Sequence, residues 1–140
     1  MPEQEKIVET IPIGPLGIIA LESSKTLCNK VNDYLVSWRE DRESEHKSTI
    51  AFSGYQRDTY LINACCPRFG TGEAKGHIKE TVRGYDLYIL VDVTNYSLTY
   101  TVRGHQNHMS PDDHYQDLKR IIAAVGGKAR RITVIMPYLY

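Results

Sequence analysis

Three short apolar runs most constrain the fold of this chain. They lie at residues 16–21, 86–92 and 132–137, and the run at 86–92 has an aspartate at either end. Continuous apolar runs of this length are typical of strands that are buried on both faces, as in parallel sheets. A fourth run, residues 59–66, is rich in β-branched and aromatic residues and ends at Pro67, because proline has no amide hydrogen to donate to a neighbouring strand. Residues 76–80 predict a weaker strand.

Two helical patterns alternate with these runs. Ser23 and Ser24 are good caps for a helix that follows the first run. The second helix has the clearest start, because Ser110 can cap it, Pro111 suits the first helical position and the next two residues are aspartates. The alternation predicts an α/β fold with a mostly parallel sheet and helices on both faces. The predicted apolar faces are Leu27, Val31, Tyr34, Leu35 and Trp38 in the first helix, and Tyr115, Leu118, Ile121, Ile122 and Val125 in the second, which Gly126 and Gly127 end.

The length of 140 residues predicts a single domain, residues 1–140, since compact domains usually hold roughly 100 to 150 residues. Residues 38–58 are predicted to be a polar insertion, because residues 40–47 are all charged or polar and cannot contribute to a core. The last predicted strand ends three residues before Tyr140, where a functional loop begins in an open α/β sheet. We therefore expect the chain to be the N-terminal part of a longer protein.

The charge balance argues against nucleic acid as a partner, and the short apolar stretches argue against a membrane. Seventeen basic and seventeen acidic side chains cancel, which argues against nucleic acid, because sequence-independent attraction to phosphates needs a basic surface. No apolar stretch approaches the roughly 20 residues that span a bilayer. The first residues also lack the basic and then apolar profile of a signal peptide. The sequence predicts a cytoplasmic protein that binds neither nucleic acid nor membrane.

The candidates for metal chemistry are weak. The odd number of cysteines predicts reduced thiols at Cys28, Cys65 and Cys66. The densest group of possible ligands is formed by His105, His108 and His114, with Asp112 and Asp113 nearby. Neither set has the spacing of a standard zinc site. We interpret the histidines as exposed polar residues. The aspartates are interpreted as stabilising the positive end of the helix dipole, so no metal ligand is assigned from the sequence.

Generic dinucleotide, phosphate-loop and hydrolase motifs are absent from the sequence. Four segments nevertheless occur in a recognisable order: Phe69-Gly70-Thr71-Gly72-Glu73, Glu80-Thr81-Val82-Arg83-Gly84, residues 86–91 and residues 130–138. In this order and spacing they resemble the N-terminal half of the ribose-phosphate diphosphokinases, or phosphoribosyl pyrophosphate synthetases. The resemblance extends upstream to residues 17–35. It implies a phosphoribosyltransferase-like α/β fold.

The resemblance also implies two binding sites. Phe69, Thr71 and Glu73 match the family's Phe-Ser-Asp-Gly-Glu loop, which contacts the adenine of ATP bound to a neighbouring subunit. An aromatic ring offers a stacking face, and a glycine lets the backbone approach a ligand closely. Thr81 and Arg83 match the family's Glu-Ser-Val-Arg-Gly stretch, which in many members forms part of a regulatory phosphate or nucleotide site. Their hydroxyl and guanidinium groups suit phosphate, and the alternative is that Arg83 only anchors a turn.

The activity that the resemblance implies is the transfer of diphosphate from MgATP to ribose 5-phosphate, giving phosphoribosyl pyrophosphate and AMP for nucleotide biosynthesis. The family enzymes require Mg²⁺, and we expect a homo-oligomer. The family's flexible catalytic loop and its acidic ribose-phosphate loop are not found in these 140 residues. We therefore expect no catalytic residue in this chain and no synthetase activity from it alone.

Two departures from the family pattern leave an alternative open. Thr71 stands where the family usually has aspartate or asparagine. Residues 110–116 replace the family's Asn-Asp-Asn-Leu-Met-Glu-Leu helix start, and the loop before them is longer. These differences favour a noncatalytic, synthetase-like regulatory or assembly subunit. A weaker alternative is an unrelated nucleotide-binding α/β domain.

Overall fold

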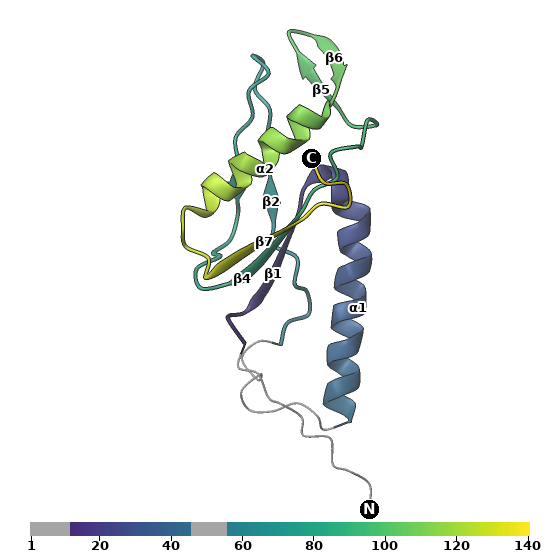
Figure 1. Cartoon of the computed structure of the whole chain (residues 1–140), viewed down its shortest axis with the longest axis vertical. Coiled ribbons are helices and arrows are strands. Elements are labelled where there is room, and N and C mark those ends of the chain that lie inside the picture. The colour runs from purple at the N-terminus through teal and green to yellow at the C-terminus, as the bar shows by residue number, and fades with distance from the viewer. Residues whose placement is uncertain (1–11, 46–55) are drawn as a thin grey trace, which may run out of the picture.

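A computed structural model describes residues 12–45 and 56–140 of the chain. Its central element is a parallel sheet with the strand order β1-β4-β7. Two helices flank this sheet, and the chain also forms two small antiparallel pairs, β2-β3 and β5-β6, of which the second lies at the start of α2 (Figure 1). In chain order the elements are β1 (Leu16–Ala20), the 3₁₀ turn η1 (Glu22–Ser24), α1 (Lys25–Ser44), β2 (Ala64–Cys65), β3 (His77–Ile78), β4 (Asp86–Leu90), β5 (Thr99–Val102), β6 (His105–His108), α2 (Pro111–Val125) and β7 (Arg131–Ile135).

The parallel sheet confirms the main prediction. Ile19 of β1 pairs with Ile89 of β4, which pairs in turn with Val134 of β7. On the outer side of β1, Leu61 forms an isolated parallel bridge to Ile18. Residues 59–66 were predicted as one strand, but they form only this bridge and the two residues of β2, which pair antiparallel with β3. The predicted weak strand at 76–80 is likewise reduced to the two residues of β3.

Alternate residues of the strands face different helices, so the sheet is covered on both faces (Figure 1). On one face Ile19, Leu87 and Ile89 pack with residues of α2 in the larger core. On the other face Ile18 and Leu90 pack with Cys28 of α1 in a smaller core. This alternation is what two-sided burial of a parallel sheet requires. The residues of the larger core are Ile19, Leu21, Ile62, Val82, Leu87, Ile89, Val91, Val93, Leu118, Ile121 and Val125.

Helix α2 forms where its local signals predict it. The Asp113 amide donates to the Ser110 hydroxyl at 3.2 Å, and the Ser110 amide donates to the Asp113 carboxylate at 2.9 Å. This reciprocal capping box satisfies amide groups that would otherwise be unpaired at the helix start. Pro111 occupies the first turn, and Gly126 ends the helix in the left-handed conformation.

Helix α1 buries only part of the predicted face: Val31 and Leu35 pack on the smaller core as predicted. Its most buried residues are Cys28 and Asn32, whereas Tyr34 and Trp38 are 64% and 60% exposed. The Asn32 side chain accepts the Tyr60 amide at 2.8 Å, so the contact face includes a polar group that an apolar pattern does not reveal. The helix continues to Ser44, so residues 38–44 of the predicted insertion are helical. Residues 46–55 of that insertion lie outside the described residues.

The β5–β6 hairpin was not predicted. It projects beyond the start of α2 (Figure 1). Arg103 and Gly104 connect its strands and both have a positive φ, of 49° and 81°. Two successive left-handed residues suit a tight two-residue hairpin, because their twist matches that of the flanking strands. Within the described ranges no helix is long and apolar enough to cross a membrane.

Candidate functional site

The loops after the carboxyl ends of β1 and β4 are tied together by hydrogen bonds. The Asp92 amide donates to the Ser23 hydroxyl at 3.0 Å, and the Asn95 side-chain amide donates to the Ser23 carbonyl at 3.4 Å. Ligands of open α/β sheets bind at this edge, in the crevice outside the carboxyl ends of the strands. The third loop, after β7, returns to α2, where the Tyr140 hydroxyl donates to the Asp112 carboxylate.

The predicted ATP-binding residues lie on a tight turn between β2 and β3. The Phe69 amide donates to the Glu73 carbonyl at 2.7 Å, and the Gly72 amide donates to the Phe69 carbonyl at 2.9 Å. Below the turn, Arg68 and Ala74 form an antiparallel bridge. Phe69, Thr71 and Glu73 are all exposed, with Phe69 51% accessible. The turn therefore presents an aromatic face, a hydroxyl and a carboxylate outward from the chain.

A cavity of about 450 Å³ lies behind this turn. It is lined by residues that follow β1, by the segment before the turn, by the start of the β5–β6 hairpin and by α2. Arg68 and Asp117 lie on its wall with side chains only 12% and 11% exposed, and they form an ion pair at 3.4 Å. The turn is thus adjacent to the carboxyl edge of the sheet.

The predicted phosphate residues lie elsewhere. Thr81 and Arg83 are exposed on a turn just before β4, at the amino ends of the strands. The Arg83 amide donates to the Thr81 hydroxyl at 3.4 Å, and the Gly84 amide donates to the Lys128 carbonyl, between α2 and β7. The structure therefore does not bring Thr81 and Arg83 together with Phe69, Thr71 and Glu73 in one site.

The histidines do not converge. His108 stacks on Tyr96 with ring centres 4.5 Å apart, and its Nδ1 lies 2.7 Å from the Tyr96 carbonyl. His114 is only 2% exposed, and its Nε2 lies 2.6 Å from the Asn95 carbonyl. The expectation that all three histidines are exposed is therefore wrong for His114. Across residues 12–45 and 56–140, no group of three or more histidine, cysteine or acidic side chains is placed to hold a metal ion.

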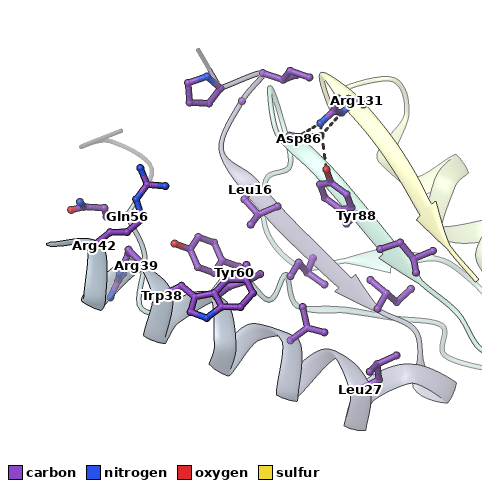
Figure 2. A pocket seen from close by; sticks show the side chains of 18 of the residues that line it. Leu16, Leu27, Trp38, Arg39, Arg42, Gln56, Tyr60, Asp86, Tyr88 and Arg131 are labelled. Carbon is purple, nitrogen blue, oxygen red and sulfur yellow. Dashed lines mark hydrogen bonds and ion pairs between the residues drawn. The ribbon is translucent and has the colours of Figure 1, made fainter. Parts of the chain in front are cut away.

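Figure 2 shows a larger cavity, of about 1010 Å³, between α1 and the sheet. Its wall is mostly apolar and includes Leu16, Trp38 and Tyr60. At the amino end of the sheet, Asp86 receives two hydrogen bonds from Arg131, at 2.6 and 2.7 Å. Sequence reasoning missed this cavity. It lies on the α1 side of the sheet and not at the carboxyl-edge loops, so we do not assign the nucleotide to it.

The thiols of Cys28 and Cys66 are predicted to resist alkylation in the native protein. Burial raises the pKa of Cys28 to about 11, and burial together with the nearby Asp117 carboxylate raises the pKa of Cys66 to about 12. At pH 8 the reactive thiolate is then on the order of one part in a thousand or less. Iodoacetamide labelling followed by mass spectrometry should modify both residues only after denaturation, and equal labelling rates before and after denaturation would contradict this.

The parallel sheet covered by helices on both faces, with loops gathered at its carboxyl edge, defines an open-sheet α/β domain, consistent with the phosphoribosyltransferase-like fold that was predicted. Within this class, residues 16–140 match the family profile of the N-terminal domain of ribose phosphate pyrophosphokinase, and the chain belongs to this family. Ribose phosphate pyrophosphokinase is another name for ribose-phosphate diphosphokinase, so the resemblance that the motifs indicated is confirmed. A search of curated proteins finds no match.

Proposed function

We propose that the protein containing this chain is a ribose-phosphate diphosphokinase. It transfers the β,γ-diphosphoryl group of ATP to the anomeric hydroxyl of ribose 5-phosphate and yields phosphoribosyl pyrophosphate and AMP. The observation that carries the proposal is the family match over residues 16–140. The exposed turn at residues 69–73 supports it, because its groups point outward, as binding to a nucleotide on another subunit requires.

In this proposal Phe69, Thr71 and Glu73 bind the ATP of a neighbouring subunit in a homo-oligomer. The Phe69 ring stacks on the flat face of the adenine, as an aromatic side chain can on any nucleobase. The Glu73 carboxylate accepts hydrogen bonds, for example from the exocyclic amino group of adenine. Thr71 supplies a hydroxyl that can donate and accept, in place of the acidic or amide group usual in the family.

The contribution of this chain to the reaction is to position the nucleotide. Diphosphoryl transfer depends mainly on the alignment of the reactants and on neutralising negative charge. We assign no catalytic residue within residues 1–140. Mg²⁺ binds nucleotide phosphates with few protein ligands, and the described residues form no metal site. We therefore assign Mg²⁺ to the ATP substrate and to none of residues 12–45 and 56–140.

A second part of the proposal concerns Thr81 and Arg83. Their hydroxyl and guanidinium groups are exposed on the turn that leads to Gly84. Together they form a regulatory phosphate site that is separate from the ATP turn. The separation at opposite ends of the strands suits a regulatory role, because a phosphate there does not compete with ATP for the turn. We place the protein in the cytoplasm, where its phosphorylated substrates occur.

The test is a synthetase assay on the purified full-length protein, with AMP and phosphoribosyl pyrophosphate as measured products. Replacing Phe69 by alanine should raise the KM for ATP about tenfold, since loss of base stacking costs on the order of 1 to 3 kcal/mol. Tyr34→Ala is the matched control, because it removes an aromatic ring that is also exposed but lies on α1, away from the turn. An unchanged KM for ATP in the Phe69→Ala variant would contradict the assignment of the turn.

The second candidate is a noncatalytic regulatory or assembly subunit. Thr71 at the family's acidic or amide position and the altered start of α2 favour it. In that case the full-length protein forms no product alone but changes the rate of an active synthetase when the two are mixed. Product formation by the full-length protein alone excludes this candidate.

A further inference from the structure

We propose that Arg68 and the β5–β6 hairpin together hold the ATP-binding turn, residues 69–73, in its binding conformation. The inference rests on the proposed function of this turn. It adds a positioning residue and a positioning element that lie outside the matched motifs. The hairpin belongs to the long loop before α2, which is where the sequence departs from the family pattern.

Arg68 contacts the turn directly. Its Nη1 donates to the Gly72 carbonyl at 2.9 Å, across the base of the turn. The bond from the Gly72 amide to the Phe69 carbonyl lies inside the loop that this contact closes, and the bond from the Phe69 amide reaches the next residue, Glu73. A charged donor makes a stronger hydrogen bond than a neutral one. The position of the Phe69 ring therefore depends on where the Arg68 guanidinium is held.

The hairpin contacts both Arg68 and the turn. The Arg68 guanidinium carbon lies 4.2 Å from the centre of the Tyr100 ring, a cation–π geometry. Val102, two residues further along β5, packs on Gly72. A Cβ atom added to Gly72 would lie 3.3 Å from a Val102 methyl carbon, which is closer than most contacts that Cβ atoms make in proteins. Residues two apart on a strand point to the same side, so one side of β5 supports the turn.

The other side of the guanidinium is anchored on α2. Arg68 Nη2 lies 3.4 Å from one oxygen of Asp117, and Arg120 Nη1 lies 2.6 Å from the other oxygen. Arg68 thus joins three elements: helix α2, strand β5 and the turn. Only a planar group with several diverging donors can meet all three at once, so lysine cannot replace arginine here.

The support is reciprocal. An isolated two-stranded hairpin is marginally stable in water. All four residues of β6 are exposed, whereas Tyr100 and Val102 of β5 are partly buried. The hairpin is therefore stabilised by its packing on Arg68 and the turn. The turn in return is held in place by the side of β5 that carries Tyr100 and Val102.

The test uses the full-length protein and the variants Arg68→Lys and Tyr100→Leu. Both should raise the KM for MgATP, Arg68→Lys by about tenfold because it loses charged hydrogen bonds. The kcat and the KM for ribose 5-phosphate should stay within about twofold, since the turn contacts only the nucleotide. Arg131→Lys is the matched control, because Arg131 also pairs with an aspartate but lies at the start of β7.

Amide hydrogen exchange gives a second readout that does not depend on activity. In the Arg68→Lys variant the amides of Phe69 and Gly72 should exchange at least about fivefold faster, while those of β4 do not change. If the wild-type protein makes no product, the proposed function fails and the exchange result alone decides the inference. Unchanged exchange at the turn, or equal changes in all kinetic parameters with faster exchange throughout the chain, would overturn it.

Discussion

Replacing Gly76 by alanine is expected to lower the free energy of unfolding by about 3 kcal/mol. Gly76 lies where the chain enters β3 and passes against α2. A Cβ atom built on Gly76 would lie 2.3 Å from the Arg120 carbonyl oxygen and 2.6 Å from its carbon. Both are backbone atoms of a helix, so no side-chain rotation can relieve the overlap. Either β3 or α2 has to move, and both pack against the larger core.

The measurement is urea denaturation followed by circular dichroism. Gly70→Ala is the matched control, because a Cβ atom at Gly70 meets no atom within 4 Å. That substitution should change the stability by less than about 0.5 kcal/mol. A cost for Gly76→Ala as small as the cost for Gly70→Ala would show that β3 does not approach α2 this closely.

The sequence predicts those elements whose signals are local. Ser110 and Asp113 lie three residues apart, and the reciprocal bonds between them form within one turn of helix. The apolar runs of β1, β4 and β7 were recognised for a similar reason, because burial on both faces leaves continuous apolar residues. In such segments the sequence pattern and the tertiary environment require the same conformation.

Other elements depend on contacts that the sequence does not reveal. The α1 helix was expected to bury Trp38, but its contact face is centred on Cys28 and Asn32, because Asn32 binds the backbone of the Tyr60 segment. The β5–β6 hairpin has exposed polar residues throughout β6, which no apolar alternation marks. One available signal was the alternation of threonine with Tyr100 and Val102, followed by Arg103-Gly104.

The candidate site also combines residues that the sequence predicts with contacts that it does not reveal. Phe69, Thr71 and Glu73 were found from the order of motifs, and the structure shows that they share one exposed turn. What holds the turn could not be found in this way. Arg68 and Asp117 are 49 positions apart, and their contact exists only because α2 packs beside the β2–β3 segment.

Replacing Asp117 by asparagine is expected to destabilise the chain by about 3 kcal/mol, because it leaves two arginines without their anion. The Asp117 side chain is 11% exposed, and its partners Arg68 and Arg120 are 12% and 21% exposed. Water therefore compensates the remaining cations poorly. Asparagine has nearly the same shape as aspartate, so the loss measures charge and not packing. Urea denaturation at low salt is the measurement.

Asp86→Asn is the matched control for this effect. Asp86 binds Arg131 through two short hydrogen bonds, at 2.6 and 2.7 Å, but the Arg131 side chain is 45% exposed. The Asp86 carboxylate is 13% exposed, but the arginine that the variant leaves without its anion can be hydrated. Asp86→Asn should therefore cost much less than Asp117→Asn, and 1 M salt should remove most of that cost. The Asp117 effect should persist in 1 M salt, because ions do not reach a buried pair. Equal costs for the two variants, or equal loss with salt, would show that the Arg68–Asp117–Arg120 group is solvated.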